Sequence, residues 1–295
     1  MNPLYIFLKG VAMGAANVIP GVSGGTMAFI TGIYERLINA LKHIDIKSIK
    51  LLLSGKFKAF AERVDFMFLV YLFLGVFISI LSLAKLLEWA LDRYEVYTLS
   101  FFFGLILASI FAVAKQISQV DLSVVVSFVI GTAIAISIAF LPPAQESDSF
   151  IYMILCGVVA VCSMILPGLS GSYILILMGN YLLVLRAVSA FEFTVLIPLL
   201  IGCVIGLITL SRLLSYLFNQ FENATISALS GFVVGSLLII WPWQTKLTAS
   251  FNGKEKVVGR IWNLPDMEGP FFLALFLILL GFLLVIWMER QSKKE

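Results

Sequence analysis

Apolar residues dominate the chain and fall in runs long enough to cross a bilayer. About 20 helical residues span the ~30 Å hydrocarbon core of a membrane. Two apolar regions, about 4–41 and 150–190, are each interrupted by a polar, Gly-rich stretch. Six other runs are continuous and are predicted as transmembrane helices, at about 66–91, 96–114, 122–141, 193–217, 224–242 and 270–288. The pattern predicts an all-α integral membrane protein.

The two interruptions share one motif. The segment Pro20–Thr26 (PGVSGGT) recurs 147 positions later as Pro167–Tyr173 (PGLSGSY). The apolar arm before each copy has only about 15 residues, or roughly 22 Å of helix, which is short for a complete span. Broken backbone is tolerated in a bilayer only where it is buried in protein or lines a cavity. Each copy therefore predicts the tip of a re-entrant helical hairpin.

The repeat extends beyond the motif and divides the chain into two halves, 1–147 and 148–295. Gly10, Gly32 and Tyr34 recur at the same offset, and further positions match at an offset of 127: Gly75 with Gly202, Thr98 with Thr225, and Gly104 with Gly231. Each half holds one hairpin and three spans, an odd number, so the second half enters the membrane in the opposite sense. Inverted-topology repeats are a transporter architecture.

Charge placement predicts the orientation. Hydrophobic residues make up 61% of the chain and charged residues 13%, far from the balance of a soluble domain. The linker at about 42–65 is rich in lysine, as cytoplasmic loops are, which places both termini in the cytoplasm. The basic 243–268 loop is an exception. The linker pattern fits an amphipathic helix on the membrane surface and equally a solvated loop.

The motif has the chemistry of an anion site. Glycine lets backbone approach a ligand closely, and N–H groups at a helix start attract negative charge. Two copies at inverted positions favour a binding site over a structural kink, and two tips meeting near mid-membrane would form a cage of N–H and hydroxyl donors. The candidate binding residues are Asn17, Gly21, Ser23, Gly24, Gly25, Thr26, Ser170, Gly171 and Ser172.

Charged residues within or beside apolar arms are further candidates, because charges at membrane depth are costly. Glu35 and Arg36 follow the first tip, and Arg186 and Arg212 lie in the second half. Each arginine fits either a phosphate clamp or an interfacial anchor. Glu35 is interpreted as pairing with Arg36 or Lys9, or as carrying a coupling proton.

Residues typical of an enzyme are sparse. His43 is the single histidine and falls in the linker. The chain has no Ser-His-Asp pattern, no HExxH and no Walker motif. We expect a transporter without a cofactor or metal, whose coupling ion, H+ or Na+, the sequence leaves open.

The residues Gly10–Thr26, followed by Gly32–Glu35, resemble the polyprenyl-phosphate (undecaprenyl phosphate) transporter family, PopT-like, of bacteria and archaea. The resemblance covers essentially the whole chain. It implies a flippase in the cytoplasmic membrane that returns undecaprenyl phosphate, the lipid carrier of cell-wall synthesis, to the cytoplasmic leaflet. It also implies that Ser23, Gly24, Gly25, Thr26 and Glu35 belong to the substrate site. The second copy departs from the first, because Leu182 stands where Glu35 would align.

Two other functions remain open on the sequence. A small-anion channel or transporter would use the same donor cage, whereas a lipid-phosphate enzyme is disfavoured by the lack of acid–base residues. Oligomeric state is not determined, although a homodimer is compatible with the sequence. The expected partners are the polyprenyl phosphate lipid and the membrane, with no nucleic acid.

Overall fold

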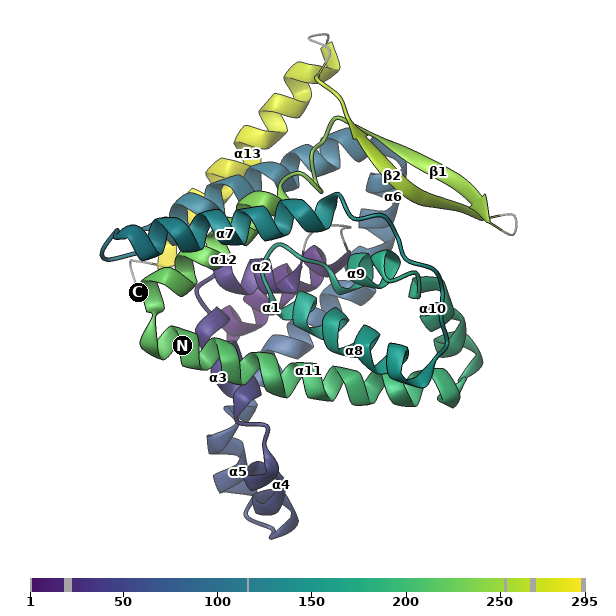
Figure 1. Cartoon of the computed structure of the whole chain (residues 1–295). Coiled ribbons are helices and arrows are strands. Elements are labelled where there is room, and N and C mark those ends of the chain that lie inside the picture. The colour runs from purple at the N-terminus through teal and green to yellow at the C-terminus, as the bar shows by residue number, and fades with distance from the viewer. Residues whose placement is uncertain (1, 19–22, 116, 252–253, 266–268, 293–295) are drawn as a thin grey trace.

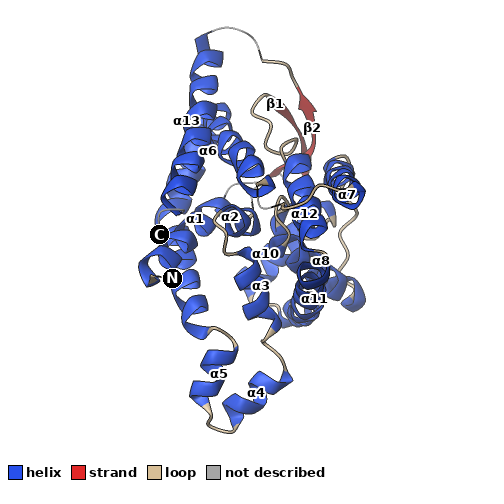
Figure 2. Ribbon diagram, turned by 90° about the vertical axis from the view of Figure 1, so that its left-hand side faces the viewer, coloured by secondary structure: helices blue, strands red, loops and turns tan. Residues whose placement is uncertain are grey.

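The computed structural model describes residues 2–18, 23–115, 117–251, 254–265 and 269–292, and confirms the all-α membrane class. A helical body carries a short helical hairpin at one end and a β-hairpin at the other (Figure 1, Figure 2). The elements are α1 (Pro3–Val18), α2 (Gly24–Ile30), α3 (Tyr34–Lys42), α4 (Ile46–Leu53), α5 (Phe57–Arg63), α6 (Phe66–Ala114), α7 (Leu122–Ala139), α8 (Phe150–Ile165), α9 (Gly171–Leu177), α10 (Tyr181–Ala190), α11 (Phe193–Gln220), α12 (Glu222–Ser236), β1 (Gln244–Phe251), β2 (Lys254–Trp262) and α13 (Gly269–Ser292).

Helices suited to crossing a membrane match most of the predicted spans. Among the described residues, five segments are long and apolar enough: Phe66–Leu83, Trp89–Phe111, Leu122–Ala139, Phe193–Gln220 and Pro270–Trp287. The predicted span 224–242 differs, because α12 ends at Ser236. Thr225, Ser227, Ser230 and Ser236 on this helix are all buried. We infer that α12 is short and polar because protein rather than lipid surrounds it.

The predicted break between the first two spans is a kink and not a loop. α6 runs for 49 residues, and only Tyr94 leaves helical geometry, with φ −138° and ψ 46°. The Thr98 hydroxyl donates to the Ala90 carbonyl across the kink at 3.1 Å. The charged residues at 92–95 suggest a loop, but the stretch lacks the Gly or Pro that would end a helix.

Each half contains a helix, a tip and a broken return arm. In the first half these are α1, then α2 and α3, and in the second half α8, then α9 and α10. The return arms break at Gly32 (φ 69°) and Gly179 (φ 75°), a left-handed conformation that glycine adopts without steric cost. We call residues 31–33 the first turn and residues 178–180 the second turn.

Glycines at corresponding positions bring helices into close contact in both halves. A Cβ added at Gly10 would lie 2.1 Å, and one at Gly75 2.2 Å, from a backbone carbonyl of the facing helix. These two glycines therefore let α1 and α6 pack closely. Gly157 and Gly202 join α8 to α11 in the same way, with distances of 2.1 and 2.0 Å. Small residues of this kind let membrane helices pack backbone to backbone.

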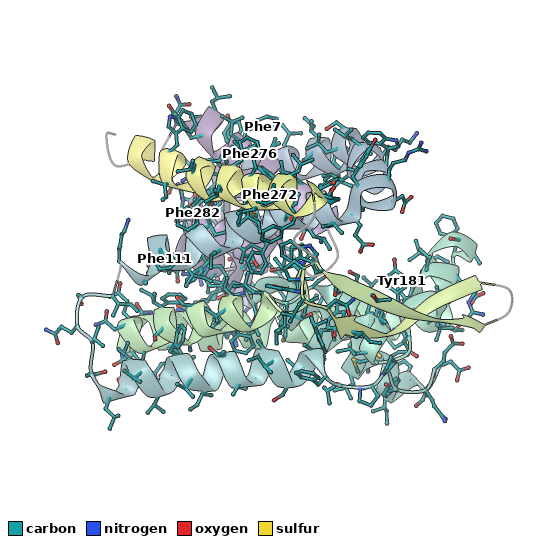
Figure 3. The ribbon with its side chains drawn as sticks, turned by 90° about the horizontal axis from the view of Figure 1, so that it is seen from above. Phe7, Phe111, Tyr181, Phe272, Phe276 and Phe282 are labelled. Carbon is teal, nitrogen blue, oxygen red and sulfur yellow. The ribbon has the colours of Figure 1, made fainter. Side chains whose placement is uncertain are left out.

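The third span of each half packs against the other half. Gly104 and Gly281 bring α6 against α13, and Gly131 and Gly231 bring α7 against α12, each with a Cβ-to-carbonyl distance between 2.0 and 2.2 Å. Seen from above, α13, α6, α12 and α7 lie side by side, with the exposed Phe272 and Phe276 on α13 (Figure 3). The halves are therefore interlocked.

Two connections differ from the sequence prediction. The 42–65 linker forms two short helices, α4 and α5, joined at Gly55 (φ 69°), instead of one helix. The 243–268 loop contains the antiparallel pair β1–β2. Asn252-Gly253 between two alternating segments is a hairpin pattern that the sequence analysis missed, and these two residues lie outside the described part.

Candidate functional site

The first tip is organised by side chains that cap a helix start. Ser23 is the N-cap of α2, and its hydroxyl accepts a hydrogen bond from the Thr26 N–H at 3.1 Å. The Gly24 N–H donates to the Asn17 amide oxygen at 2.7 Å. Two N–H groups that a helix start leaves open are thereby satisfied. Gly21 lies outside the described residues.

The two tips contact each other directly, although 142 residues separate the joined positions. The Gly168 N–H donates to the Thr26 hydroxyl at 2.8 Å. The Ser23 hydroxyl donates to the Leu166 carbonyl at 3.2 Å. A Cβ added at Gly25 would lie 2.3 Å from the Ile165 carbonyl, so only glycine permits this approach. We call residues 23–26 together with 165–172 the tip junction.

Burial differs across the tip junction. Thr26 is fully buried and Ser23 is 2% exposed, whereas Ser172 is exposed. Ser170 and Ser172 share a hydrogen bond of 2.8 Å between their hydroxyls. Gly168 has φ +91°, and a Cβ there would meet the Phe232 carbonyl at 2.7 Å. The glycines of the motif therefore serve close packing as well as presenting polar groups.

The candidate arginines lie outside the tip junction, and two of them form ion pairs. The Arg36 guanidinium makes two hydrogen bonds to the Asp65 carboxylate, at 2.6 and 3.1 Å, and stacks over the Phe68 ring at 4.4 Å. Arg186 pairs with Glu146 at 2.9 and 3.0 Å. Arg212 is exposed on α11. The structure thus brings Asn17, Ser23, Gly24, Gly25 and Thr26 together with the second tip, and leaves Arg36, Arg186 and Arg212 outside this contact.

An open cavity of about 530 Å³, lined mainly by charged and polar residues, lies beside the first turn. Its lining includes Gly32, Glu35, Arg36, Asn39, His43 and Asp65. Glu35 is exposed there, and the predicted Glu35–Arg36 pair is replaced by Arg36–Asp65. Lys9 donates to the Thr31 carbonyl at 2.8 Å. The cavity places both signs of charge next to the first hairpin.

The second turn is covered where the first is open. Among the described residues, a Cβ added at Gly32 would meet nothing within 4 Å, whereas one at Gly179 would lie 2.3 Å from the Ala144 carbonyl. Residues 141–149, which we call the strap, cross this position. The fully buried Asn180 binds the strap in both directions, accepting from the Ser147 N–H at 2.9 Å and donating to its carbonyl at 2.7 Å. The Ala144 N–H donates to the Leu177 carbonyl at 2.6 Å.

Three polar residues near the two turns were not among the residues predicted from the sequence. Asp65, the partner of Arg36, lies at the end of the linker with φ 50°, and its carboxylate is separated from Arg36 by 29 positions. Asn180 stands where the first half has Ile33, and this polar-for-apolar difference within the repeat could have identified it. Asn39 was also missed; it accepts from Ser215 on α11 at 3.0 Å.

The fold and the tip junction define a multi-pass helical membrane protein with a polar contact between its two halves. The chain belongs to the undecaprenyl phosphate translocase-like family (VCA0040-like), which matches residues 13–258. It is 40% identical over 303 aligned residues to a polyprenyl-phosphate transporter of Vibrio cholerae serotype O1, covering 100% of this chain and 98% of that protein. A polyprenyl-phosphate transporter of Staphylococcus aureus is 28% identical over 309 residues, covering 98% and 96%. No solved structure matches.

Proposed function

We propose that this protein translocates polyprenyl phosphate across the cytoplasmic membrane and so recycles undecaprenyl phosphate for cell-wall glycopolymer synthesis. Full-length similarity to two polyprenyl-phosphate transporters supports the substrate class. The observation that carries the proposal for this chain is the hydrogen bond between the Gly168 N–H and Thr26, which joins two polar tips inside an apolar bundle. Both termini then lie in the cytoplasm, as the basic linker suggests.

The two halves are, in this proposal, inverted repeats. The corresponding glycine contacts of α1–α6 and α8–α11, and of α6–α13 and α7–α12, support equivalent packing in the two halves. Each half crosses the membrane an odd number of times, so the second half enters the membrane in the opposite sense to the first. Transporters of this architecture bind substrate near mid-membrane at the interface of the repeats, which is where the tip junction would lie.

The head group is held by the tip junction. A phosphate monoester carries close to two negative charges at neutral pH and has three strong acceptor oxygens. Ser23, Thr26, Ser170 and Ser172 offer hydroxyl donors, and the Gly25 N–H at the start of α2 adds a backbone donor. The Thr26–Gly168 hydrogen bond opens to admit the head group, while the isoprenoid tail stays in lipid.

Arg36 delivers the head group from the cavity to the tip junction. Its guanidinium presents a paired donor edge to Asp65 in the described state, and the same edge suits a phosphate. A dianionic head group competes with the single negative charge of Asp65. Glu35 and His43, which also line the cavity, provide candidate sites for a coupling proton.

The open first turn and the strapped second turn represent one of two access states. In the other state the strap releases Asn180, and the linker closes over Gly32. This exchange is the rocking of one repeat against the other that alternating access requires.

The test is a leaflet-resolved assay of undecaprenyl phosphate in liposomes, with and without a proton gradient. We expect Ser23→Ala and Thr26→Val to slow translocation by roughly fivefold or more, since a neutral hydrogen bond contributes about 1 kcal/mol. Ser137→Ala, which removes an exposed hydroxyl on α7 that donates to the Ala133 carbonyl of its own helix, is the matched control. Absence of lipid movement by the parent chain overturns the proposal. Ion flux without lipid movement would indicate a small-anion transporter, and release of inorganic phosphate an enzyme.

A further inference from the structure

We infer that the α4–α5 hairpin is a membrane-surface anchor that docks onto a leaflet rich in anionic lipid. The inference concerns the linker and is independent of which substrate the protein carries. The hairpin projects from the helical body at the end opposite to the β-hairpin (Figure 2). Both of its ends continue into helices of the body, α3 and α6.

The polarity of the hairpin is reversed relative to a water-soluble element. Its interior is polar: the Arg63 guanidinium donates to the Asp45 carboxylate at 2.7 Å and to the Ser48 hydroxyl at 3.1 Å. Ser48 is only 1% exposed, its N–H donates to Asp45 at 2.9 Å, and its hydroxyl donates to the His43 carbonyl. Hydrogen bonds and an ion pair therefore join α4 to α5.

Most large apolar side chains of the hairpin are exposed. Leu53 is 81% exposed and Ile46 71%, and Phe57, Ile49 and Leu52 are exposed as well. Leu53 is more exposed than Trp287 of the spanning helix α13, at 62%. A polar interior with an apolar exterior is unfavourable in water and favourable at the headgroup–acyl boundary, where interfacial helices bury their apolar faces.

The charge of the hairpin suits an anionic surface. Between Ile46 and Arg63 the chain has a single carboxylate, Glu62. Four lysines are exposed around the apolar residues: Lys47, Lys50, Lys56 and Lys58. Basic residues near a cytoplasmic leaflet each contribute about 1 kcal/mol of attraction to anionic lipid. The same lysines would repel a second copy of the hairpin.

The exposed apolar surface continues into a membrane-spanning helix. The Phe60 ring of α5 lies 6.2 Å from the Phe66 ring, the first residue of α6. Phe66 is 44% and Met67 60% exposed, and both begin the span Phe66–Leu83. A lipid surface that contacts the start of this span therefore also reaches α5.

A nitroxide at Leu53→Cys tests the docking in the full-length protein. The accessibility of this label to oxygen and to a water-soluble nickel chelate is measured in liposomes of phosphatidylethanolamine and phosphatidylglycerol. Glu62→Cys, on the same hairpin, is the matched control. The parent chain without the added cysteine is treated with the same nitroxide reagent. It gives the background signal from the native cysteines, which lie in α8 and α11. We expect oxygen to relax the label at position 53 strongly and nickel weakly, with the order reversed at position 62.

Two further measurements separate a lipid surface from other partners. Replacing Lys47 and Lys50 by Gln is expected to shift position 53 toward nickel accessibility, by about fivefold in the partition constant for each lysine. Phosphatidylcholine liposomes should shift it in the same direction. Nickel accessibility of position 53 equal to that of position 62 in the anionic liposomes overturns the inference. Strong dipolar broadening between labels at position 53 on two copies would also overturn it, because a second protomer would then cover the hairpin.

Discussion

The two return arms carry the same glycine and end in different environments. Gly32 and Gly179 have φ values of 69° and 75°, so the chain makes nearly the same turn in each half. The first turn borders a cavity lined by acidic and basic side chains, and the second is covered by the strap and held by the buried Asn180. Equal local geometry therefore does not give equal access, and the difference comes from segments far away in the sequence.

The hairpins also differ in how they are embedded. The largest cluster of buried apolar residues surrounds the first hairpin and includes Ala28, Ile33 and Ile38, whereas a smaller cluster around Met153 and Cys156 supports the second. The second hairpin compensates with polar contacts from Asn180. We infer that the second turn is released more easily, because a few hydrogen bonds separate its covered and open states.

The largest predicted effect distinguishes the arginines of the two hairpins. Arg36→Gln is expected to slow translocation by roughly 10- to 100-fold, since hydrogen bonds from a charged group contribute about 1.5–3 kcal/mol. Arg186→Gln, which removes the exposed Arg186–Glu146 pair, should change the rate little. The leaflet-resolved assay measures both variants, and their thermal unfolding in detergent should remain close to that of the parent. Equal losses of transport in the two variants would contradict a special role for the open cavity.

Removing Asn180 should open the second turn. Asn180→Ala leaves the N–H and carbonyl of Ser147 without their side-chain partner, and each lost hydrogen bond contributes about 0.5–1.5 kcal/mol. We expect faster hydrogen exchange in residues 141–149. Ser189→Ala, which removes an exposed hydroxyl bonded to its own helix, is the control. Unchanged exchange in the strap would show that other contacts hold it.

The two glycines provide a matched pair. Gly32→Ala and Gly179→Ala both impose a left-handed backbone on alanine, at a similar cost of about 1–2 kcal/mol. Only Gly179→Ala also meets a carbonyl, and overpacking adds about 1–3 kcal/mol. The midpoint of thermal unfolding should therefore fall further for Gly179→Ala. If the two midpoints agree, the strap does not press on the second turn.

The smallest effect is a pH dependence of the linker beside the open turn. The hydrogen bond from Arg63 lowers the pKa of Asp45 to about 2, and the Ser48 N–H contributes to the decrease against the opposing effect of burial. A depressed carboxyl pKa stabilises the hairpin above the unfolded value near 3.9, and the contribution is lost as pH falls toward 2. A nitroxide at Leu53→Cys should become more mobile between pH 4 and 2. In the Asp45→Asn variant the label should be equally mobile already at neutral pH. If neither acid nor this substitution changes the mobility of the label, the Arg63–Asp45 ion pair is not the main contact that holds α4 to α5.

The sequence was sufficient for the membrane class and for recognising that one Gly-rich motif occurs twice; the inverted repeat and the binding role of the tips stay predictions. Hydropathy and span length reflect a requirement that the bilayer places on each segment separately. The PGVSGGT and PGLSGSY motifs could be matched because glycine and hydroxyl residues inside apolar runs are locally unusual. The direct tip-to-tip contact of Thr26 with Gly168 agrees with the expectation that the tips meet.

Tertiary packing was needed for everything that depends on distant partners. The sequence offered Lys9 or Arg36 as partners of Glu35, but Arg36 pairs with Asp65 because the linker folds back through α4 and α5. The strap covers Gly179, whereas no described segment covers Gly32, although both turns have a similar backbone conformation. Hydropathy describes one segment at a time, whereas pairing and access depend on which segments lie together after folding.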